Sequence, residues 1–230
     1  MNDSSDSTAL RRTLAPLGVL PVVELPSVDS AVPLAEALLA AGCRVAEITL
    51  RSAAGLAALP LVRAACPDIL LGAGTVRTTT DVRQAVDAGA RFIVSPGTKA
   101  EVVALSHDLG VPAVPGVCTP TEMEMALGAG ADIVKFFPAE AMGGLAAIAA
   151  MAGPFPDVAI IPTGGINQTN LASYLRLRNV LACGGSWLVS KDLLVEARFD
   201  MVTSLAREAL AIATEAASGG TVAAAFETRP

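Results

Sequence analysis

The sequence predicts an α/β fold, a single-domain (β/α)8 TIM barrel with a short extra N-terminal helix, and three observations support this prediction. Apolar, β-branched segments recur at intervals of roughly 20 to 26 residues. Helical patterns such as AVPLAEALLAAG and KAEVVALSHDLG lie between these segments. Glycines end the helical patterns, as left-handed C-caps do before a following strand. Strict alternation of this kind indicates a parallel sheet covered by helices.

The segments expected to form strands are 19–25, 45–50, 68–74, 91–97, 111–116, 132–138, 157–165 and 180–185. Eight such units fit a closed barrel, whose usual size of about 250 residues is close to the 230 residues of this chain. The alternative is an open doubly wound sheet, whose first turn often carries G-x-G-x-x-G, a pattern that the stretch GAGTVR does not match. We expect the barrel to span residues 9–216, with a helix in TALRRTLAPLG, a flexible N-terminus at 1–8 and a flexible C-terminal tail at 217–230.

The composition argues against several other classes of protein. The chain is 53% hydrophobic and only 17% charged, which is typical of a compact globular protein and not of a disordered one. Its net charge is −6 and it has no basic cluster, so we expect no nucleic-acid partner. No uninterrupted apolar run reaches the length of about 18 residues that a membrane span needs, so we expect no membrane partner.

The cysteines and the histidine bear on location and on metal binding. The first residues, MNDSSDST, lack the basic and apolar plan of a signal peptide. Four cysteines are widely spaced, which is typical of reduced thiols, so we expect a cytoplasmic protein. The single histidine, His107, excludes a zinc site built on two or three histidines, and we expect neither a metal nor a cofactor.

Unusual polar residues fall at the carboxyl ends of the expected strands, where barrels of this type carry their active sites. Glu47, Thr49 and Arg51 are spaced by two and therefore share one face of the second strand. Lys135 lies in the middle of the apolar run IVKFF, and Phe137 shares its face. The seventh strand ends in TGG and the eighth in GGS.

Each of these features has a structural explanation when it is taken alone. Glu47 and Arg51 could form a structural ion pair, Lys135 could reach solvent from a strand end, and glycine pairs are mostly tight turns. Their convergence is harder to explain structurally, because a carboxylate, a guanidinium and an amine enter one barrel mouth beside two glycine-rich turns. We therefore interpret the set as an active site.

The chemical roles follow from the residue types. Desolvation and a neighbouring cation both disfavour a charged amine, so we expect Lys135 to act as a nucleophile toward a ketone. Glu47 is the candidate general acid and base, and Arg51 can bind a substrate carboxylate through its planar guanidinium. The TGG and GGS turns match the backbone phosphate site common in these barrels. Together these groups predict a Schiff-base lyase that acts on a phosphorylated keto acid.

The motifs VAEITLR, GAGTV, SPG, VKFFPAE, PTGGI and GGSWL, in this order, resemble the 2-keto-3-deoxy-6-phosphogluconate (KDPG) and 4-hydroxy-2-oxoglutarate aldolase family, over roughly residues 15 to 215. The resemblance implies a class I aldolase on a (β/α)8 barrel, usually a homotrimer, in the Entner–Doudoroff pathway. Its reaction would release pyruvate and glyceraldehyde 3-phosphate from 2-dehydro-3-deoxy-6-phosphogluconate. The resemblance also implies action on 4-hydroxy-2-oxoglutarate.

The resemblance also assigns residues. Lys135 would form the Schiff base and Glu47 would shuttle protons. The substrate would be bound by Arg51 and Thr75 at the carboxylate, by Pro96 and Phe137 at the pyruvate, and by Gly164, Gly165, Gly185 and Ser186 at the phosphate. Thr163, before the glycine pair, favours the gluconate substrate, because the related enzyme for the galactonate epimer tends to have an aliphatic residue there. Glu24, where many relatives have apolar or basic residues, is a second carboxylate that could lie near the mouth.

Three alternatives remain open at this point. A phosphosugar isomerase or synthase on a similar barrel would need the phosphate turns but not a buried lysine with a glutamate. A non-catalytic binder of phosphorylated metabolites would leave Lys135 and Glu47 unexplained. An aldolase for the galactonate epimer would differ mainly at Thr163.

Overall fold

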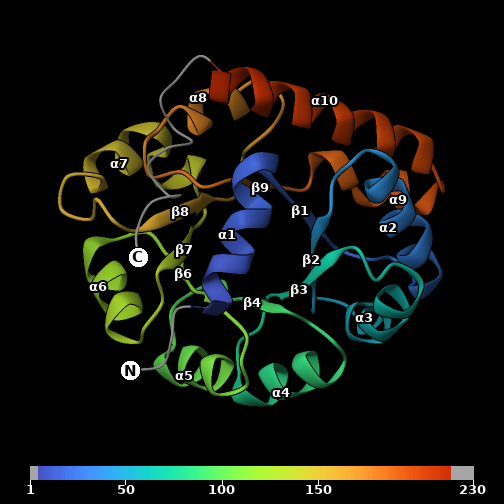
Figure 1. Ribbon diagram of the computed structural model, residues 1–230, viewed down its shortest axis with the longest axis horizontal. Coiled ribbons are helices and arrows are strands. Elements are labelled where there is room, and N and C mark those ends of the chain that lie inside the picture. Colours follow the sequence, from blue (N-terminus) through green and yellow to red (C-terminus); the bar gives the residue numbers. More distant parts are fainter. Residues whose placement is uncertain (1–4, 219–230) are drawn as a thin grey trace.

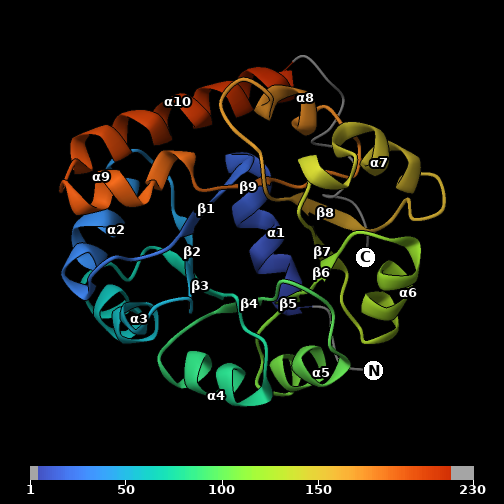
Figure 2. The ribbon, with the colours of Figure 1, turned by 180° about the vertical axis from the view of Figure 1, so that it is seen from behind.

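The structure is a computed structural model that describes residues 5–218 of the chain. Parallel strands curl around the middle of the molecule, helices α2 to α10 surround them, and α1 crosses one side of the strands (Figure 1). Figure 2 shows the opposite side, with α1 behind the strands. None of the described helices is both long enough and apolar enough to cross a membrane.

The strands form two parallel sheets. Their bounds are β1 Val19–Val23, β2 Val45–Thr49, β3 Leu70–Gly74, β4 Phe92–Val94, β5 Ala113–Val114, β6 Gly116–Val117, β7 Ile133–Phe136, β8 Ala159–Pro162 and β9 Cys183–Gly185. The first sheet has the order β5-β4-β3-β2-β1-β9, and the second has the order β6-β7-β8. Apart from Leu70, every strand residue is buried, which explains why the strands read as continuous apolar runs in the sequence.

The expected strand at 111–116 is divided in the structure. β5 pairs with β4, and β6 pairs with β7, with Pro115 between them. Proline has no N–H group to donate to a ladder, so it interrupts a strand. Its carbonyl still accepts a hydrogen bond from the Lys135 N–H at 2.9 Å. The prediction of one strand here was therefore wrong in detail, although the segment does run between the strands it was expected to join.

Two isolated parallel bridges lie beyond the named pairings. One joins Ile160 to Val180, and the other joins Thr163 to Gly184. They connect the segment of β8 with the segment leading into and through β9. Because β9 is at the edge of the first sheet and β8 at the edge of the second, the bridges bring these two edges together.

The helices follow the strands in the expected alternation. Their bounds are α1 Ser5–Leu17, α2 Ala31–Ala40, α3 Ala53–Ala65, α4 Thr79–Asp87, α5 Ala100–Asp108, α6 Pro120–Gly128, α7 Gly144–Met151, α8 Leu171–Leu175, α9 Lys191–Val195 and α10 Phe199–Ser218, with the 3-10 turns η1 Val28–Ser30, η2 Glu140–Met142 and η3 Trp187–Val189. Capping boxes start α4 and α6, where Thr78 pairs with Asp81 and Thr119 with Glu122.

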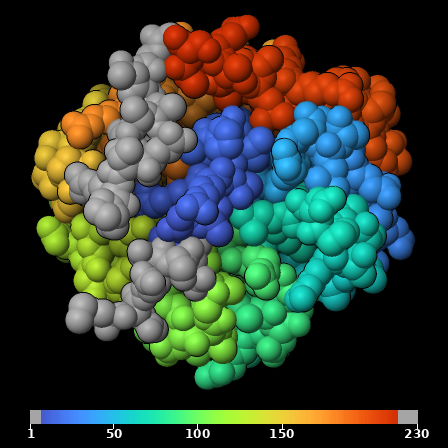
Figure 3. Space-filling model, in the orientation of Figure 1, coloured from blue at the N-terminus to red at the C-terminus, as the bar shows by residue number. Residues whose placement is uncertain are grey.

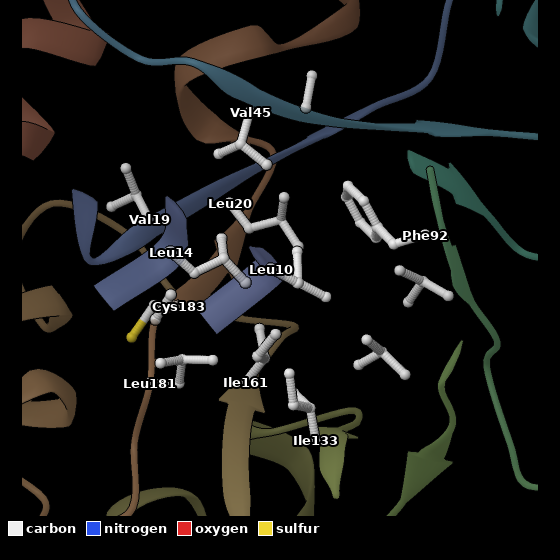
Figure 4. Close-up of a cluster of buried hydrophobic side chains, with 14 of the residues drawn as sticks. Leu10, Leu14, Val19, Leu20, Val45, Phe92, Ile133, Ile161, Leu181 and Cys183 are labelled. Atoms are coloured by element: carbon white, nitrogen blue, oxygen red, sulfur yellow. The ribbon is translucent and has the colours of Figure 1, made fainter. Parts of the chain in front are cut away.

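Helix α1 closes the amino-terminal side of the strands. Leu10 and Leu14 are buried among Val19, Val45 and Ile133, residues that begin three strands (Figure 4). In the space-filling view α1 covers the middle of this face (Figure 3). With this side filled by side chains, the carboxyl ends of the strands are the side left for a site.

The ends of the chain bear on the predicted boundaries. Helix α1 begins at Ser5, inside the segment 1–8 that the sequence assigns to a flexible N-terminus, and Ser7 Oγ donates a hydrogen bond to Asp132 at 2.9 Å. Arg11 also pairs with Asp132 at 3.0 Å. Helix α10 continues to Ser218, and the rest of the expected tail at 217–230 lies outside the described residues.

Candidate active site

Lys135 and Glu47 meet inside the molecule, although 88 positions separate them in the sequence. Lys135 comes from β7 and Glu47 from β2, and their Nζ and Oε1 atoms are 3.4 Å apart. The side chains are only 6% and 1% exposed. Burying an isolated charge costs free energy, and the opposite charge of each group offsets part of that cost for the other. Lys135, the lysine within the apolar run, therefore points toward a carboxylate in the interior.

The Glu47 carboxylate has one oxygen without a partner. Its Oε2 is buried and makes no hydrogen bond to any residue that the structure describes. Unsatisfied buried polar atoms are rare in folded proteins and frequently mark functional sites. The free oxygen leaves this carboxylate able to take a proton from a molecule bound next to Lys135.

Gly74, at the end of β3, provides the space for this carboxylate. A Cβ atom at position 74 would lie 2.6 Å from Glu47 Cγ and 2.7 Å from Cδ, well inside van der Waals contact. Glycine is therefore required here by close approach and not by backbone conformation. The motif GAGT thus leaves room for the Glu47 carboxylate at Gly74 and also supplies Thr75.

Arg51 and Thr75 lie together just beyond β2 and β3. Arg51 Nε donates a hydrogen bond to Thr75 Oγ1 at 3.2 Å. Thr75 has a positive φ of 59°, which is an outlier for a β-branched residue and is typical of strained functional positions. Arg51 Nη1 also pairs with Glu24 Oε2 at 3.5 Å. Glu24 is therefore part of the mouth, as the sequence left open, and the interpretation of Glu47 and Arg51 as a mutual ion pair is wrong.

A hollow of about 610 Å³ adjoins this pair. Its lining includes three cationic residues, Arg51, Arg77 and Lys99, and one carboxylate, Asp81, so its rim is predominantly cationic. Such a rim favours anionic ligands in a protein whose net charge is −6.

The two residues expected to wall the substrate, Phe137 and Pro96, lie after β7 and β4. Phe137 follows β7, and its ring centroid is 5.3 Å from Lys135 Nζ. Pro96 follows β4 and is exposed, where it lines a second hollow of about 190 Å³ with Ser95 and Arg77. The Phe137 ring therefore lies beside the Lys135 amine, whereas Pro96 lines a hollow whose lining does not include Lys135.

The turn after β8 has the features of an anion site. Gly164 and Gly165 have positive φ angles of 99° and 81°, which glycine adopts without strain. Within the described chain their N–H groups donate to no protein acceptor. Two adjacent N–H groups without a protein acceptor are donors that a bound anion could use. Thr163 is buried just before the turn, and its Oγ1 is 3.4 Å from the Ile161 carbonyl.

The second glycine turn lies beside the first. The bridge between Thr163 and Gly184 joins the two segments, so Gly185 and Ser186 follow directly. Position 184 has no room for a side chain, because a Cβ there would lie 3.1 Å from Thr163 Cβ. Ser186 is exposed at the start of η3, and the ring of Trp187 packs against Gly185. The structure therefore brings together all four residues that the sequence assigns to phosphate.

Sequence reasoning did not predict a polar contact between two side chains next to these turns. The hydroxyl of Tyr174 donates a hydrogen bond to Glu140 Oε1, next to the Gly164–Gly165 turn. The only sequence signal is that Glu140 ends the quoted motif VKFFPAE, and nothing in the sequence links it to Tyr174.

The described cysteines and acidic residues show no metal centre. All four cysteines are free, and no group of three or more metal-ligating side chains occurs among the described residues. Burial raises the pKa of the Cys43 thiol to about 11, so it stays protonated at neutral pH.

Comparison with known proteins places the chain among aldolases. Residues 10–205 match the model of a family described as KDPG and KHG aldolase. A 2-dehydro-3-deoxy-phosphogluconate aldolase from Treponema pallidum is 47% identical over 194 residues, which cover 84% of this chain and 92% of that protein. The KHG/KDPG aldolase of Escherichia coli K12 is 41% identical, covering 84% of this chain and 90% of that one.

A solved structure agrees with these relatives. KDPG aldolase from Legionella pneumophila, with pyruvate captured at low pH as a covalent carbinolamine intermediate, superposes with a TM-score of 0.83. It is 41% identical and covers 86% of this chain and 96% of that one. A structure described as native KDPGal has a TM-score of 0.79 at 28% identity, covering 87% and 96% of the two chains.

Proposed function

The chain belongs to the KDPG and KHG aldolase family, and from this premise we propose that it cleaves 2-dehydro-3-deoxy-6-phosphogluconate to pyruvate and glyceraldehyde 3-phosphate through a Schiff base on Lys135. The observation that carries the proposal is the buried pair of Lys135 and Glu47, with a separation of 3.4 Å and a free Glu47 oxygen. A binding protein would have no need to bury this pair.

Lys135 and Glu47 share the proton transfers of the first half of the reaction. Lys135 gives a proton to Glu47 and its free amine attacks the C2 ketone, forming a carbinolamine. Glu47 returns the proton to the C2 oxygen, which leaves as water and gives an iminium. The iminium is the electron sink that the later bond cleavage needs.

Glu47, again a carboxylate, serves as the base in the second half. It takes the proton of the C4 hydroxyl, the C3–C4 bond breaks, and its electrons move into the iminium to give an enamine. The aldehyde leaves, and Glu47 then protonates C3 of the enamine. Water hydrolyses the resulting iminium, which releases pyruvate and the free lysine.

The two ends of the substrate have separate sites in this proposal. Arg51 and Thr75 bind the C1 carboxylate, and the free N–H groups of Gly164 and Gly165, with Gly185 and Ser186, bind the phosphate. Phe137 and Pro96 wall the pyruvate end. Orientation at both ends holds C2 next to Lys135, which is a large part of the rate enhancement that enzymes obtain from positioning.

The gluconate substrate is favoured over its galactonate epimer by two observations. Relatives named for the gluconate substrate are 41–47% identical, whereas the KDPGal structure is 28% identical. Thr163 is buried directly before the phosphate turn, where its hydroxyl can distinguish groups on the substrate. Since relatives are also named KHG/KDPG aldolase, we propose that 4-hydroxy-2-oxoglutarate is a second substrate.

The finer features of architecture and location belong to the same proposal. The bridges between β8 and β9, and the continuity of β5 and β6 through Pro115, support a complete (β/α)8 barrel. Resemblance to the family supports a homotrimer in the cytoplasm. Light scattering of the purified chain would test the trimer.

The proposal is tested by comparing the wild-type enzyme with Lys135→Ala. We expect the wild type to release pyruvate from the phosphorylated substrate, and the variant to lose about a thousandfold or more of kcat. We expect inorganic phosphate to bind both proteins, with a change in the fluorescence of Trp187, the single tryptophan, which lies beside Ser186. Phosphate binding without wild-type turnover would instead support a non-catalytic binding barrel.

A further inference from the structure

We propose that Tyr174 is a positioning residue for the phosphate end of the site, acting through Glu140 on the Gly164–Gly165 turn. The inference rests on the proposed function, because it takes this turn to be the phosphate site. Neither residue has a role in the bond-breaking steps, yet the hydroxyl of a buried tyrosine is bonded to the carboxylate of an exposed glutamate beside the turn.

Tyr174 is held firmly in the protein. It lies on α8, is fully buried, and is the single tyrosine of the chain. Burial first, and then the hydrogen bond to Glu140 and its charge, raise the pKa of the phenol well above its usual value. The hydroxyl therefore keeps its proton at neutral pH and remains a donor to Glu140.

Glu140 is bound directly to the turn. It follows the strand of Lys135, and its backbone N–H donates to the Gly164 carbonyl at 3.1 Å, next to the bond from Ala139 N–H to the Thr163 carbonyl at 2.8 Å. Its stem fills the space beside Gly165, since a Cβ at that position would lie 2.6 Å from Glu140 Cβ. A shift of the Glu140 side chain is thus a shift of the surface against which Gly165 rests.

Helix α8 holds the other side of the same turn. Asn170, which precedes the helix by one residue, donates from Nδ2 to the Gly165 carbonyl at 3.0 Å. Tyr174 is four residues later and therefore on the same helical face. The bond between Tyr174 and Glu140 consequently links the two structures that hold the turn, namely α8 and the segment after β7.

The link matters because of charge. The stem of Glu140 lies against Gly165, and its carboxylate is bound to Tyr174 close by, near the turn where a bound phosphate would carry up to two negative charges. Tyr174 fixes this carboxylate by a hydrogen bond and neutralises part of its charge. If the hydroxyl is removed, the exposed carboxylate of Glu140 is free to approach the phosphate, and both the geometry and the electrostatics of the turn worsen.

The test is Tyr174→Phe, which keeps the buried ring and removes only the hydroxyl. With the phosphorylated substrate we expect KM to rise about fivefold, equivalent to about 1 kcal/mol, and kcat to stay within about twofold. With 4-hydroxy-2-oxoglutarate, which has no phosphate, we expect both parameters to stay within about twofold. Inorganic phosphate, followed through Trp187 fluorescence, should bind about fivefold more weakly.

Ser173→Ala is the matched control, because Ser173 is exposed on the same helix and makes no side-chain hydrogen bond to any described residue. It should match the wild type in every assay, and circular dichroism should show that both variants are folded. Equal losses on both substrates, or no loss on the phosphorylated one, would overturn the role of Tyr174. The proposed function itself would fail separately, in a wild type that cleaves neither substrate.

Discussion

Replacing Gly74 by alanine tests whether the position of Glu47 controls catalysis. A Cβ at residue 74 would lie 2.6 Å from Glu47 Cγ, whereas carbon atoms pack at about 3.5–4.0 Å. Glu47 must therefore move by about 1 Å, away from a partner that is 3.4 Å away. The Lys135 and Glu47 pair would be separated or turned, while the backbone of residue 74 would accept alanine, since it is not in the left-handed region.

A displacement of this size costs roughly a hundredfold in rate when it affects a reacting group. We expect kcat of Gly74→Ala to fall by about that factor, equivalent to about 2.7 kcal/mol, with KM for the phosphorylated substrate little changed. The assay couples pyruvate release to lactate dehydrogenase and follows NADH absorbance. Overpacking should also lower the free energy of unfolding by about 1–3 kcal/mol, so kcat is measured at a temperature where a melting curve shows the variant folded.

Gly128→Ala is the matched control. Gly128 ends α6 and is exposed, and a Cβ there would meet no atom within 4 Å. This variant should keep wild-type kinetics and be as stable as the wild type or slightly more so. If Gly74→Ala retained kcat within about threefold of the control, the placement of Glu47 by Gly74 would not matter and the reasoning would be refuted.

Three further predictions concern binding, pH and thiol reactivity. Arg51→Lys should raise KM for pyruvate-forming substrates about tenfold, because lysine lacks the planar guanidinium that can make two hydrogen bonds to a carboxylate. An unchanged KM would exclude Arg51 as the residue that binds the substrate carboxylate. Hydrogen bonds hold the pKa of Glu122 below its usual range; they come first from the backbone N–H of Cys118 and then from the Cys118 thiol and from Thr119. The Glu122 carboxylate therefore stabilises the fold at pH values above its unfolded-state pKa. This stabilisation disappears as the pH falls through the folded-state pKa of Glu122. Glu122→Ala should thus cost about 1 kcal/mol of unfolding free energy at neutral pH and nothing in acid, as urea titrations at several pH values will show, and a pH-independent difference would contradict this. A thiol reagent at pH 8 should modify the half-buried Cys118 before the buried Cys43, whose pKa is about 11, and mass mapping that finds Cys43 first would refute that order.

The sequence predicts the alternation of strands and helices and the meeting of Lys135 with Glu47. Both predictions rest on strong signals, namely buried strands that read as apolar runs and charged residues that interrupt them. Parallel strands of such a fold place their carboxyl ends on one side, so topology alone brings these two residues to one region. The chemistry of a paired amine and carboxylate then follows from residue type.

Other features could not be read from the sequence because they depend on packing between distant segments. The division of one strand at Pro115 depends on which neighbouring strand each backbone N–H and carbonyl group is hydrogen-bonded to. The pairing of Arg51 with Glu24 depends on the direction of the two side chains at a loop. The contact of Tyr174 with Glu140 joins segments 34 residues apart, with no periodicity to reveal it. The positive φ of Thr75 has no sequence signal at all, since β-branched residues rarely adopt it.

The central claim is that Lys135 forms the Schiff base, and borohydride reduction in the presence of pyruvate tests it most directly. After reduction, proteolysis and mass spectrometry of the peptides should locate one reduced pyruvyl adduct on Lys135 in the wild type. Lys99, an exposed lysine at the rim of the hollow, provides an internal control that should remain unmodified. An adduct on another lysine, or no adduct on folded protein under conditions in which a known class I aldolase is trapped, would contradict the account.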